Sequence, residues 1–283
     1  MRQNTFEGAS RMITFAVLVL VSIAAAGGLL WSGLYQDNPF VRAIWQGNDV
    51  VTLLVALPLL AYGLIGTLNG SRKANLIRLG MLDTLFYAYT FYLFSAAFNA
   101  FFLVYSLLVT FSLLGLILGL MDLDLAAVKE LFSDKTPVRW IGGYQIFVGL
   151  GLSVVYLLQI SAFIFSGEVP AIIAKTDHIT HIVPALDMTF VIPWLLLGGI
   201  LIWQRKAWGY VISSIMMVKG VVYMLTLAVG SASAALAGFP ESGAEIPLWG
   251  ILWIGFVVLG IWMLASTRKQ GLNEGAVGSG EEA

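Results

Sequence analysis

The chain has 283 residues, of which 59% are hydrophobic and 11% are charged, and its mean hydropathy is +0.89. Soluble domains usually carry about 25% charged residues, so this composition excludes an ordinary water-soluble globule and indicates an integral membrane protein in contact with the lipid bilayer. A net charge of −1 provides no basic excess, and we expect no nucleic-acid partner. The sequence contains no cysteine, which excludes disulfides, thiolate metal sites and a catalytic thiol.

Apolar stretches of about 20 residues, the length that crosses a bilayer, recur along the whole chain. We predict eight spans: Met12–Leu34, Val50–Asn69, Leu79–Phe98, Phe101–Met121, Trp140–Phe165, Pro184–Gln204, Trp208–Leu236 and Pro247–Thr267. The connections between them are short and leave no room for a soluble domain. The predicted fold is therefore an all-α, polytopic membrane helix bundle with eight transmembrane helices.

The basic residues are distributed unequally between the two sides of this predicted bundle. Of the 15 Lys and Arg residues, 12 lie on the side of the termini, whereas only Arg42 and Lys175 lie on the other. By the positive-inside rule, both termini are cytoplasmic and the chain is a multi-pass protein of the plasma (inner) membrane. We expect the acidic residues to lie mainly in outer loops: Asp37, Asp49, Glu168, Asp177, Asp187, Glu241 and Glu245.

The N-terminal segment resembles a signal peptide, with two arginines before an apolar run and a triplet of small residues. The apolar stretch continues to Leu34, however, which favours a first span that is retained.

The two halves of the chain resemble each other. Met81–Tyr87 matches Met217–Tyr223 at an offset of 136 residues, and Pro58 pairs with Pro193 at nearly the same offset. Because each half contains four predicted spans, the pattern predicts a 4+4 parallel internal repeat, related by an axis along the membrane normal.

The expected segments are a cytoplasmic N-terminus (1–11), a first repeat (12–121), a cytoplasmic amphipathic linker (122–139), a second repeat (140–267) and a disordered cytoplasmic tail (268–283).

Asp83 and Lys219 are the two charges inside the predicted spans, and they occupy equivalent positions of the repeat. Either residue type costs about 2.5–3.5 kcal/mol at the centre of a membrane helix, so we expect both to turn inward and neutralise each other. Each shares a helix face with a tyrosine and a threonine at spacings i, i+4 and i+7. The predicted substrate or ion site therefore contains Asp83, Lys219, Tyr87, Tyr223, Thr90 and Thr226.

This intramembrane site has two plainer interpretations. The pair is also consistent with a bridge that only holds two helices in register. Asp83 also lies close enough along the chain to Arg78 to pair with it instead.

Pro58 and Pro193 each fall in the middle of a predicted span, where a proline removes a backbone hydrogen bond and breaks or kinks the helix. Matching helix breaks in two repeats are typical of transporter binding sites. Proline is also common in membrane helices that it merely bends.

His178 and His181, one helical turn apart, lie close in sequence to Asp187 and are a candidate metal site on the outer face. The alternative is a solvated loop with two histidines. We also expect a short helix on the inner surface within 123–132, and another on the outer surface within 39–45.

These features favour a small secondary transporter or permease with an intramembrane Asp–Lys polar site. The alternative is a non-catalytic membrane subunit or scaffold with partner membrane subunits, including one that binds a lipophilic ligand. A membrane enzyme acting at the outer face, through the two histidines with Asp49 and Asp187, has the fewest supporting residues. The sequence identifies no cofactor, and no catalytic residue is assigned.

Overall fold

The computed structural model describes residues 3–268, and this part of the chain is almost entirely helical. Its helices are α1 (Gln3–Leu30), α2 (Pro39–Val51), the π-helical turn η1 (Thr52–Ala56), α3 (Leu57–Leu68), α4 (Arg72–Ser95), α5 (Phe102–Met121), α6 (Leu125–Leu131), α7 (Val138–Ser166), α8 (Ala171–Thr176), α9 (Ile182–Phe190), α10 (Ile192–Trp203), α11 (Ala207–Leu236), the 3₁₀ helix η2 (Pro240–Glu245) and α12 (Ile246–Ala265). Within residues 3–268, the extended structure is a single β-bridge between Phe132 and Thr267. The expected disordered tail lies outside the described residues apart from Arg268.

Seven helical segments of the described chain are long and apolar enough to cross a membrane, which establishes the coarse prediction of a helical membrane bundle. They are Phe6–Leu30, Pro39–Leu68, Phe102–Met121, Val138–Ser166, Ile182–Trp203, Ala207–Leu236 and Pro240–Ala265. The remaining predicted span corresponds to α4, whose apolar residues alternate with Asp83, tyrosines and threonines. Neighbouring helices cover most of α4, and a helix shielded from lipid does not need an apolar surface on every side.

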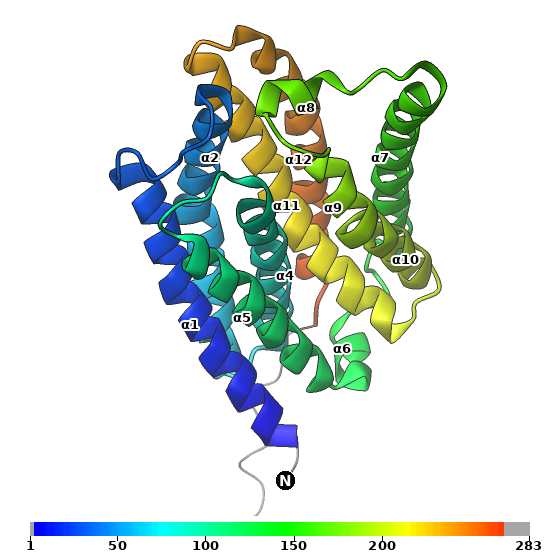
Figure 1. Ribbon diagram of the computed structural model, residues 1–283. Helices are drawn as coiled ribbons and strands as arrows, with labels where there is room; N and C mark the ends of the chain where they lie inside the picture. Colours follow the sequence, from blue (N-terminus) through cyan, green and yellow to red (C-terminus); the bar gives the residue numbers. More distant parts are fainter. Residues whose placement is uncertain (1–2, 269–283) are drawn as a thin grey trace, which may run out of the picture.

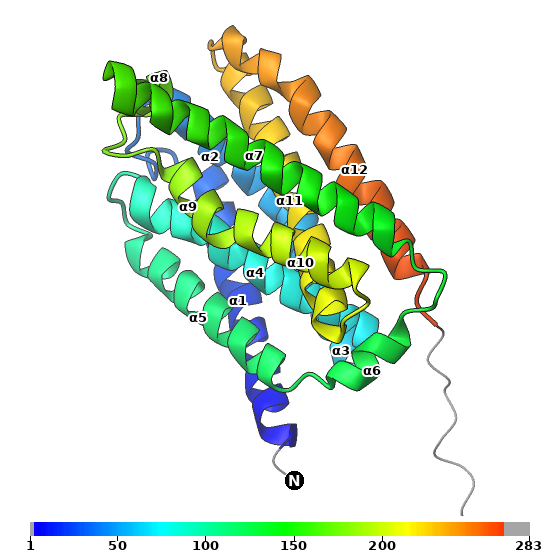
Figure 2. The same ribbon diagram turned by 90° about the vertical axis from the view of Figure 1, so that its right-hand side faces the viewer.

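The helices form two groups that meet along α4 and α11. Helices α1, α3, α4 and α5 pack together in the first half, and α7, α10, α11 and α12 pack together in the second. Across the boundary, α11 packs against both α2 and α4, so it lies between the groups (Figure 1). Helix α9 packs against α4, while α10 continues from α9 and packs against α7 and α11 (Figure 2). The two helices that carry Asp83 and Lys219 therefore form the centre of the molecule.

Both predicted proline positions lie next to an irregular piece of helix. The π-helical turn at Thr52–Ala56 ends just before Pro58, and α9 stops at Phe190, three residues before Pro193. Val191, between α9 and α10, has φ −123° and ψ −62°, outside the helical range. Both prolines are exposed on the outside of the bundle, so they act through the backbone rather than through contacts in the interior.

Three sequence expectations about position are wrong. The segment 39–45 does not lie on the surface: it begins a continuous helix from Pro39 to Leu68, capped by the Asn38 side chain, which accepts a hydrogen bond from the Val41 N–H. Asp49 and Asp187 are therefore not loop residues; they lie in α2 and α9, and each is 1% exposed. The first helix also begins at Gln3 and ends at Leu30, because Gly33 turns the chain with a φ of +88°.

The predicted short helix between the halves is present as α6. Asp124 caps its first turn by accepting a hydrogen bond from the Ala127 N–H. Its apolar face is buried by Val128 and Leu131 against the bundle, where α6 contacts α11 and α4. It therefore joins the two groups of helices rather than lying free on the bilayer.

Close packing of α4 on α11 depends on Gly80. A methyl group added there would lie 2.7 Å from Cβ of Val218, too close for the helices to keep their separation. By contrast, Gly151 in α7 has no atom within 4 Å of the position of an added Cβ. The two helical glycines thus form a matched pair, one at the boundary between the groups and one in open space.

We predict that Gly80→Ala destabilises the protein by about 1–3 kcal/mol, because overpacking forces α4 and α11 apart. Gly151→Ala should leave stability unchanged or raise it by up to about 1 kcal/mol, the usual gain of replacing glycine within a helix. Thermal unfolding of the purified full chain in one detergent measures both. Equal effects of the two changes would show that the α4–α11 contact is not as tight as described.

Candidate functional site

The structure brings Asp83 and Lys219 together at the boundary between the two groups of helices. The Lys219 Nζ lies 3.2 Å from Oδ2 of Asp83, and the lysine side chain is 1% exposed. Arg78 does not pair with Asp83; its guanidinium donates hydrogen bonds to Ser10, Thr14 and Asn75. The buried ammonium of Lys219 therefore has Asp83 as its ion-pair partner among the described residues.

Lys219 also links the ion pair to the break between α9 and α10. Its Nζ donates a hydrogen bond of 3.2 Å to the carbonyl of Phe190, the last residue of α9. The same ammonium lies 4.5 Å from the centre of the Tyr87 ring, a cation–π contact. One lysine thus contacts a carboxylate and an aromatic face on α4 and the end of α9.

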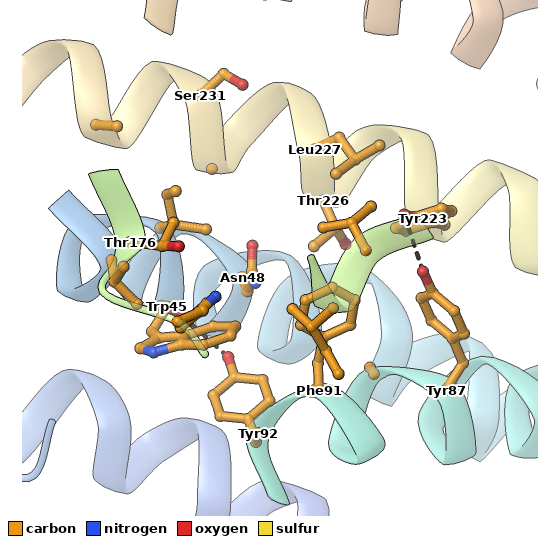
Figure 3. Close-up of a pocket in the computed structure, with 18 of the residues that line it drawn as sticks. Trp45, Asn48, Tyr87, Phe91, Tyr92, Thr176, Tyr223, Thr226, Leu227 and Ser231 are labelled. Atoms are coloured by element: carbon orange, nitrogen blue, oxygen red, sulfur yellow. Dashed lines mark hydrogen bonds between the residues drawn. The ribbon is translucent and has the colours of Figure 1, made fainter. Parts of the chain in front are cut away.

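A second carboxylate, Asp187, completes this polar centre. Tyr87 of α4 and Tyr156 of α7 each donate a hydrogen bond of 2.5 Å to one of its two oxygens. The Tyr223 hydroxyl of α11 lies 3.4 Å from both oxygens and 2.9 Å from the Tyr87 hydroxyl (Figure 3). We define the polar centre as Asp83, Lys219, Tyr87, Tyr223, Asp187 and Tyr156. Two carboxylates here accompany one ammonium.

The two predicted threonines contribute less than expected. Thr90 and Thr226 each donate a hydrogen bond to a carbonyl four residues earlier in their own helix. Thr226 nevertheless lines the central cavity, whereas Thr90 is buried elsewhere on α4. The structure therefore brings together Asp83, Lys219, Tyr87 and Tyr223, and it leaves Thr90 outside.

Asp49 forms a similar arrangement in the first half. The Tyr35 hydroxyl donates to one oxygen of Asp49 at 2.5 Å, and the Tyr92 hydroxyl donates to the other at 3.1 Å. Gly28 of α1 makes room for this carboxylate, since an added Cβ there would lie 1.9 Å from it. None of the ion pairs found within residues 3–268 includes Asp49, so two tyrosine donors replace a cation.

Between these two carboxylates lies a cavity of about 220 Å³, bounded by α2, α4, α8, the segment before α9, and α11. Tyr87 and Tyr92 both line it, as does Tyr223, so the tyrosines stand between the cavity and the buried aspartates (Figure 3). Most of the remaining lining is apolar or aromatic, including Trp45 and Phe91. A molecule in this cavity would therefore touch the hydroxyl groups that hold both carboxylates.

The end of the cavity away from the N-terminus is covered by α8 and the loop after it. Lys175 of α8 lies 2.8 Å from a Glu241 oxygen and 4.0 Å from the centre of the Phe40 ring. His178 Nε2 lies 3.0 Å from the Ser95 hydroxyl, at the end of α4. These contacts attach one short segment to α2, α4 and η2 at once.

The predicted metal site does not form. Within residues 3–268, no three His, Asp or Glu side chains are grouped so that they could hold a metal ion. The reason is that Asp187 points into the bundle towards three tyrosines, while His178 contacts Ser95 on the other side of the cavity. The sequence had placed Asp187 beside the histidines only because they are close along the chain.

Tyr35, Tyr92 and Tyr156 are not among the site residues predicted from the sequence, and Asp49 is predicted there as a loop residue. One signal was available: Asp49 and Asp187 are separated by 138 residues, close to the offset of the repeat, and both precede the matched prolines. No comparable offset relates Tyr35 to Tyr156. Helix packing brings each tyrosine to its carboxylate. Tyr35, just after α1, binds Asp49, and Tyr156 of α7 binds Asp187.

Two charged side chains of the polar centre, Lys219 and Asp187, each have more than one partner, so one partner can be lost while others remain. Lys219 has both a carboxylate and a carbonyl as acceptors, and each oxygen of Asp187 already accepts a hydrogen bond of 2.5 Å from a tyrosine hydroxyl. Hydrogen bonds to a charged group are stronger than those between neutral groups. The site can therefore hold an ion or a polar ligand group while it reorganises.

We predict strong coupling between Asp83 and Lys219. Replacing either residue by alanine leaves the other charge buried and unpaired, which should cost about 3–5 kcal/mol of stability. The double variant Asp83→Ala with Lys219→Ala should cost less than the sum of the two single changes, because no unpaired charge is left. Thermal unfolding of all four proteins in one detergent measures the coupling. Strictly additive losses would contradict a direct interaction between the two side chains.

We also predict that His178 makes stability depend on pH. Burial lowers the pKa of His178 below its ordinary value of 6.5, although the negative charges of Asp37 and Asp177 oppose the effect. The neutral form is favoured in the folded protein, so its stabilisation is fully present above pH 6.5 and is lost as the pH falls through the lower pKa of the folded state.

The apparent unfolding temperature should therefore fall from pH 8 to pH 5 more steeply in the wild type than in His178→Gln. His181→Gln should flatten the curve as well, because burial also lowers the pKa of His181. Parallel curves for the wild type and His178→Gln would rule out this contribution.

Comparison with known proteins does not assign the chain to a family: no protein-family model, curated protein or solved structure matches it. Function is therefore inferred from the chemistry of the polar centre, the second carboxylate and the cavity between them.

Proposed function

We propose that the protein is a small secondary transporter or permease whose substrate binds in the cavity between the two groups of helices. One observation supports this most strongly: the cavity borders a polar centre to which both groups contribute, with Asp83 on α4 and Lys219 on α11. Intramembrane charges that face a cavity are typical of substrate and ion pathways. A bridge with only a structural role has no need of an adjoining cavity.

In this proposal α4 also crosses the bilayer, as the eighth span, and the two groups of helices descend from a duplicated four-helix unit. Support comes from the position of the matched helix irregularities near Pro58 and Pro193, and from a buried aspartate held by tyrosines in each group. Both termini are cytoplasmic, so the cavity lies nearer the outer side of the plasma membrane.

Alternating access then consists of a movement of one group against the other along the α4–α11 contact. The break at Val191 allows α9 to move relative to α10. Such a movement changes the hydrogen bond of Lys219, because Lys219 binds the carbonyl at the end of α9. A ligand drives the change only if it binds one arrangement better than the other. Contact with Tyr87 and Tyr223 provides such a difference.

A second candidate is a non-catalytic membrane subunit that binds a lipophilic ligand without moving it. The aromatic lining of the cavity, with Trp45, Phe91 and Tyr92 on neighbouring helices, favours this function equally well. The two candidates differ in one respect: only a transporter must open the other side of the polar centre to water.

Because the chain has no cysteine, single cysteines can be introduced without a prior background change. Thr226→Cys places a thiol in the cavity, and Val218→Cys places one on the other side of Lys219, where α11 packs against Gly80. We predict that a membrane-impermeant maleimide modifies residue 226 from the outside and residue 218 from the inside. Right-side-out and inside-out vesicles separate the two directions.

Ser214→Cys is the matched control, because this residue of α11 is buried and faces Met263 of α12 within one group. It should react from neither side. Modification of residue 218 as slow as that of residue 214, with residue 226 still reacting from outside, would contradict transport and favour the static subunit.

A further inference from the structure

One polar side chain on α2 faces the cavity without a hydrogen-bond partner among the described residues. Asn48 lines the cavity, and its side-chain amide makes no hydrogen bond to another side chain or backbone group within residues 3–268. One turn earlier, Trp45 also lines the cavity; it is 3% exposed, and its buried indole N–H has no partner in the described chain. The Trp45 N–H is enclosed by protein, whereas the half-buried Asn48 side chain is open to the cavity. Its unpaired amide is therefore available to hydrogen-bond a ligand there.

The position of Asn48 suits an anchor. Figure 3 shows its side chain extending from α2 towards α11, in the space between Trp45 and Thr226. Gly230 of α11 makes room for it, since an added Cβ there would lie 3.2 Å from the Asn48 Oδ1. An asparagine amide offers a donor and an acceptor side by side. It therefore matches a ligand group with the complementary pair, such as a carboxamide.

The other residues that line the cavity favour a ligand with an aromatic ring system. Phe40, Trp45 and Phe91 contribute aromatic rings, and Ile44 and Leu227 contribute aliphatic surface. Flat aromatic molecules pack favourably against such rings. A volume of about 220 Å³ admits a compact molecule of one or two rings rather than a lipid.

The charged groups around the cavity already have partners within the described chain. Lys175 pairs with Glu241, and Glu245 accepts hydrogen bonds from Ser231 and Trp249. Burial lowers the pKa of both His178 and His181, so they are mainly neutral at neutral pH. Asp49 and Asp187 do not line the cavity; each is 1% exposed and lies behind tyrosines. A charged ligand would therefore lose its hydration without directly contacting a free counter-charge, which is expensive in an apolar cavity.

We propose that the cavity binds an uncharged aromatic molecule bearing a carboxamide-like group, with Asn48 pairing with that group. This inference rests on the proposed function, since it names the substrate class of the same site. Tyr223 and Tyr87 then meet the opposite end of the molecule, next to the polar centre.

Three probes with the same ring system test the proposal: naphthamide, the uncharged hydrocarbon ethylnaphthalene, and the anion naphthoate. Binding of radiolabelled naphthamide to the full chain in nanodiscs is measured directly, and the other two are used as competitors. We expect naphthamide to bind, and naphthoate to compete at least tenfold more weakly. Asn48→Leu, of similar size, should weaken naphthamide about tenfold, the effect of losing two hydrogen bonds, and should leave competition by ethylnaphthalene unchanged.

The matched control is Gln46→Leu, which removes a neighbouring amide that is exposed on α2 and does not line the cavity. It should bind naphthamide like the wild type. The proposal is overturned if the wild type does not bind naphthamide, if naphthoate binds most tightly, or if both leucine variants behave alike.

The loss of naphthamide binding and the loss of transport are distinguished by two different measurements. Alternating modification of residues 226 and 218 without naphthamide binding would leave a transporter with another substrate class. Naphthamide binding without such alternation would identify a ligand-binding subunit.

Discussion

The cost of placing charge in a low-dielectric interior determines much of this structure. Lys219 carries a buried ammonium near the middle of a 30-residue helix, and such a group persists only with partners. It has three, from two helices: the Asp83 carboxylate and the face of Tyr87, both on α4, and the Phe190 carbonyl at the end of α9. Because these partners belong to both groups of helices, neutralising one charge also positions α4, α9 and α11 relative to one another.

The buried carboxylates also need partners, and tyrosine hydroxyls provide them. Asp187 and Asp49 each accept short hydrogen bonds from two tyrosine hydroxyls, so their oxygens are satisfied although both side chains are 1% exposed. Tyr87 and Tyr92, which lie on the same helix, provide one of these bonds in each case and also line the cavity. Helix α4 therefore connects the wall of the cavity with both buried carboxylates.

The helix irregularities are explained by backbone chemistry. A proline cannot donate the hydrogen bond that a regular helix needs, and the ladder is disturbed in the turn before it. The π-helical turn before Pro58 and the break at Val191 before Pro193 both follow from this rule. At the second break, Lys219 donates a hydrogen bond to the carbonyl of Phe190, the last residue of α9. The buried ammonium and the helix break thus lie next to each other.

Composition and hydropathy, by themselves, determined that this protein is a membrane helix bundle, because lipid-facing helices must be apolar over about 20 residues. They also singled out Asp83 and Lys219, since a charge within an apolar stretch is visible in the sequence. Only the tertiary structure decided the rest. Asp49 and Asp187 look like loop acids next to polar neighbours, and their burial depends on tyrosines that come from other helices. The cavity and the unpaired amide of Asn48 likewise arise from how α2, α4 and α11 pack, which depends on contacts between residues far apart along the chain.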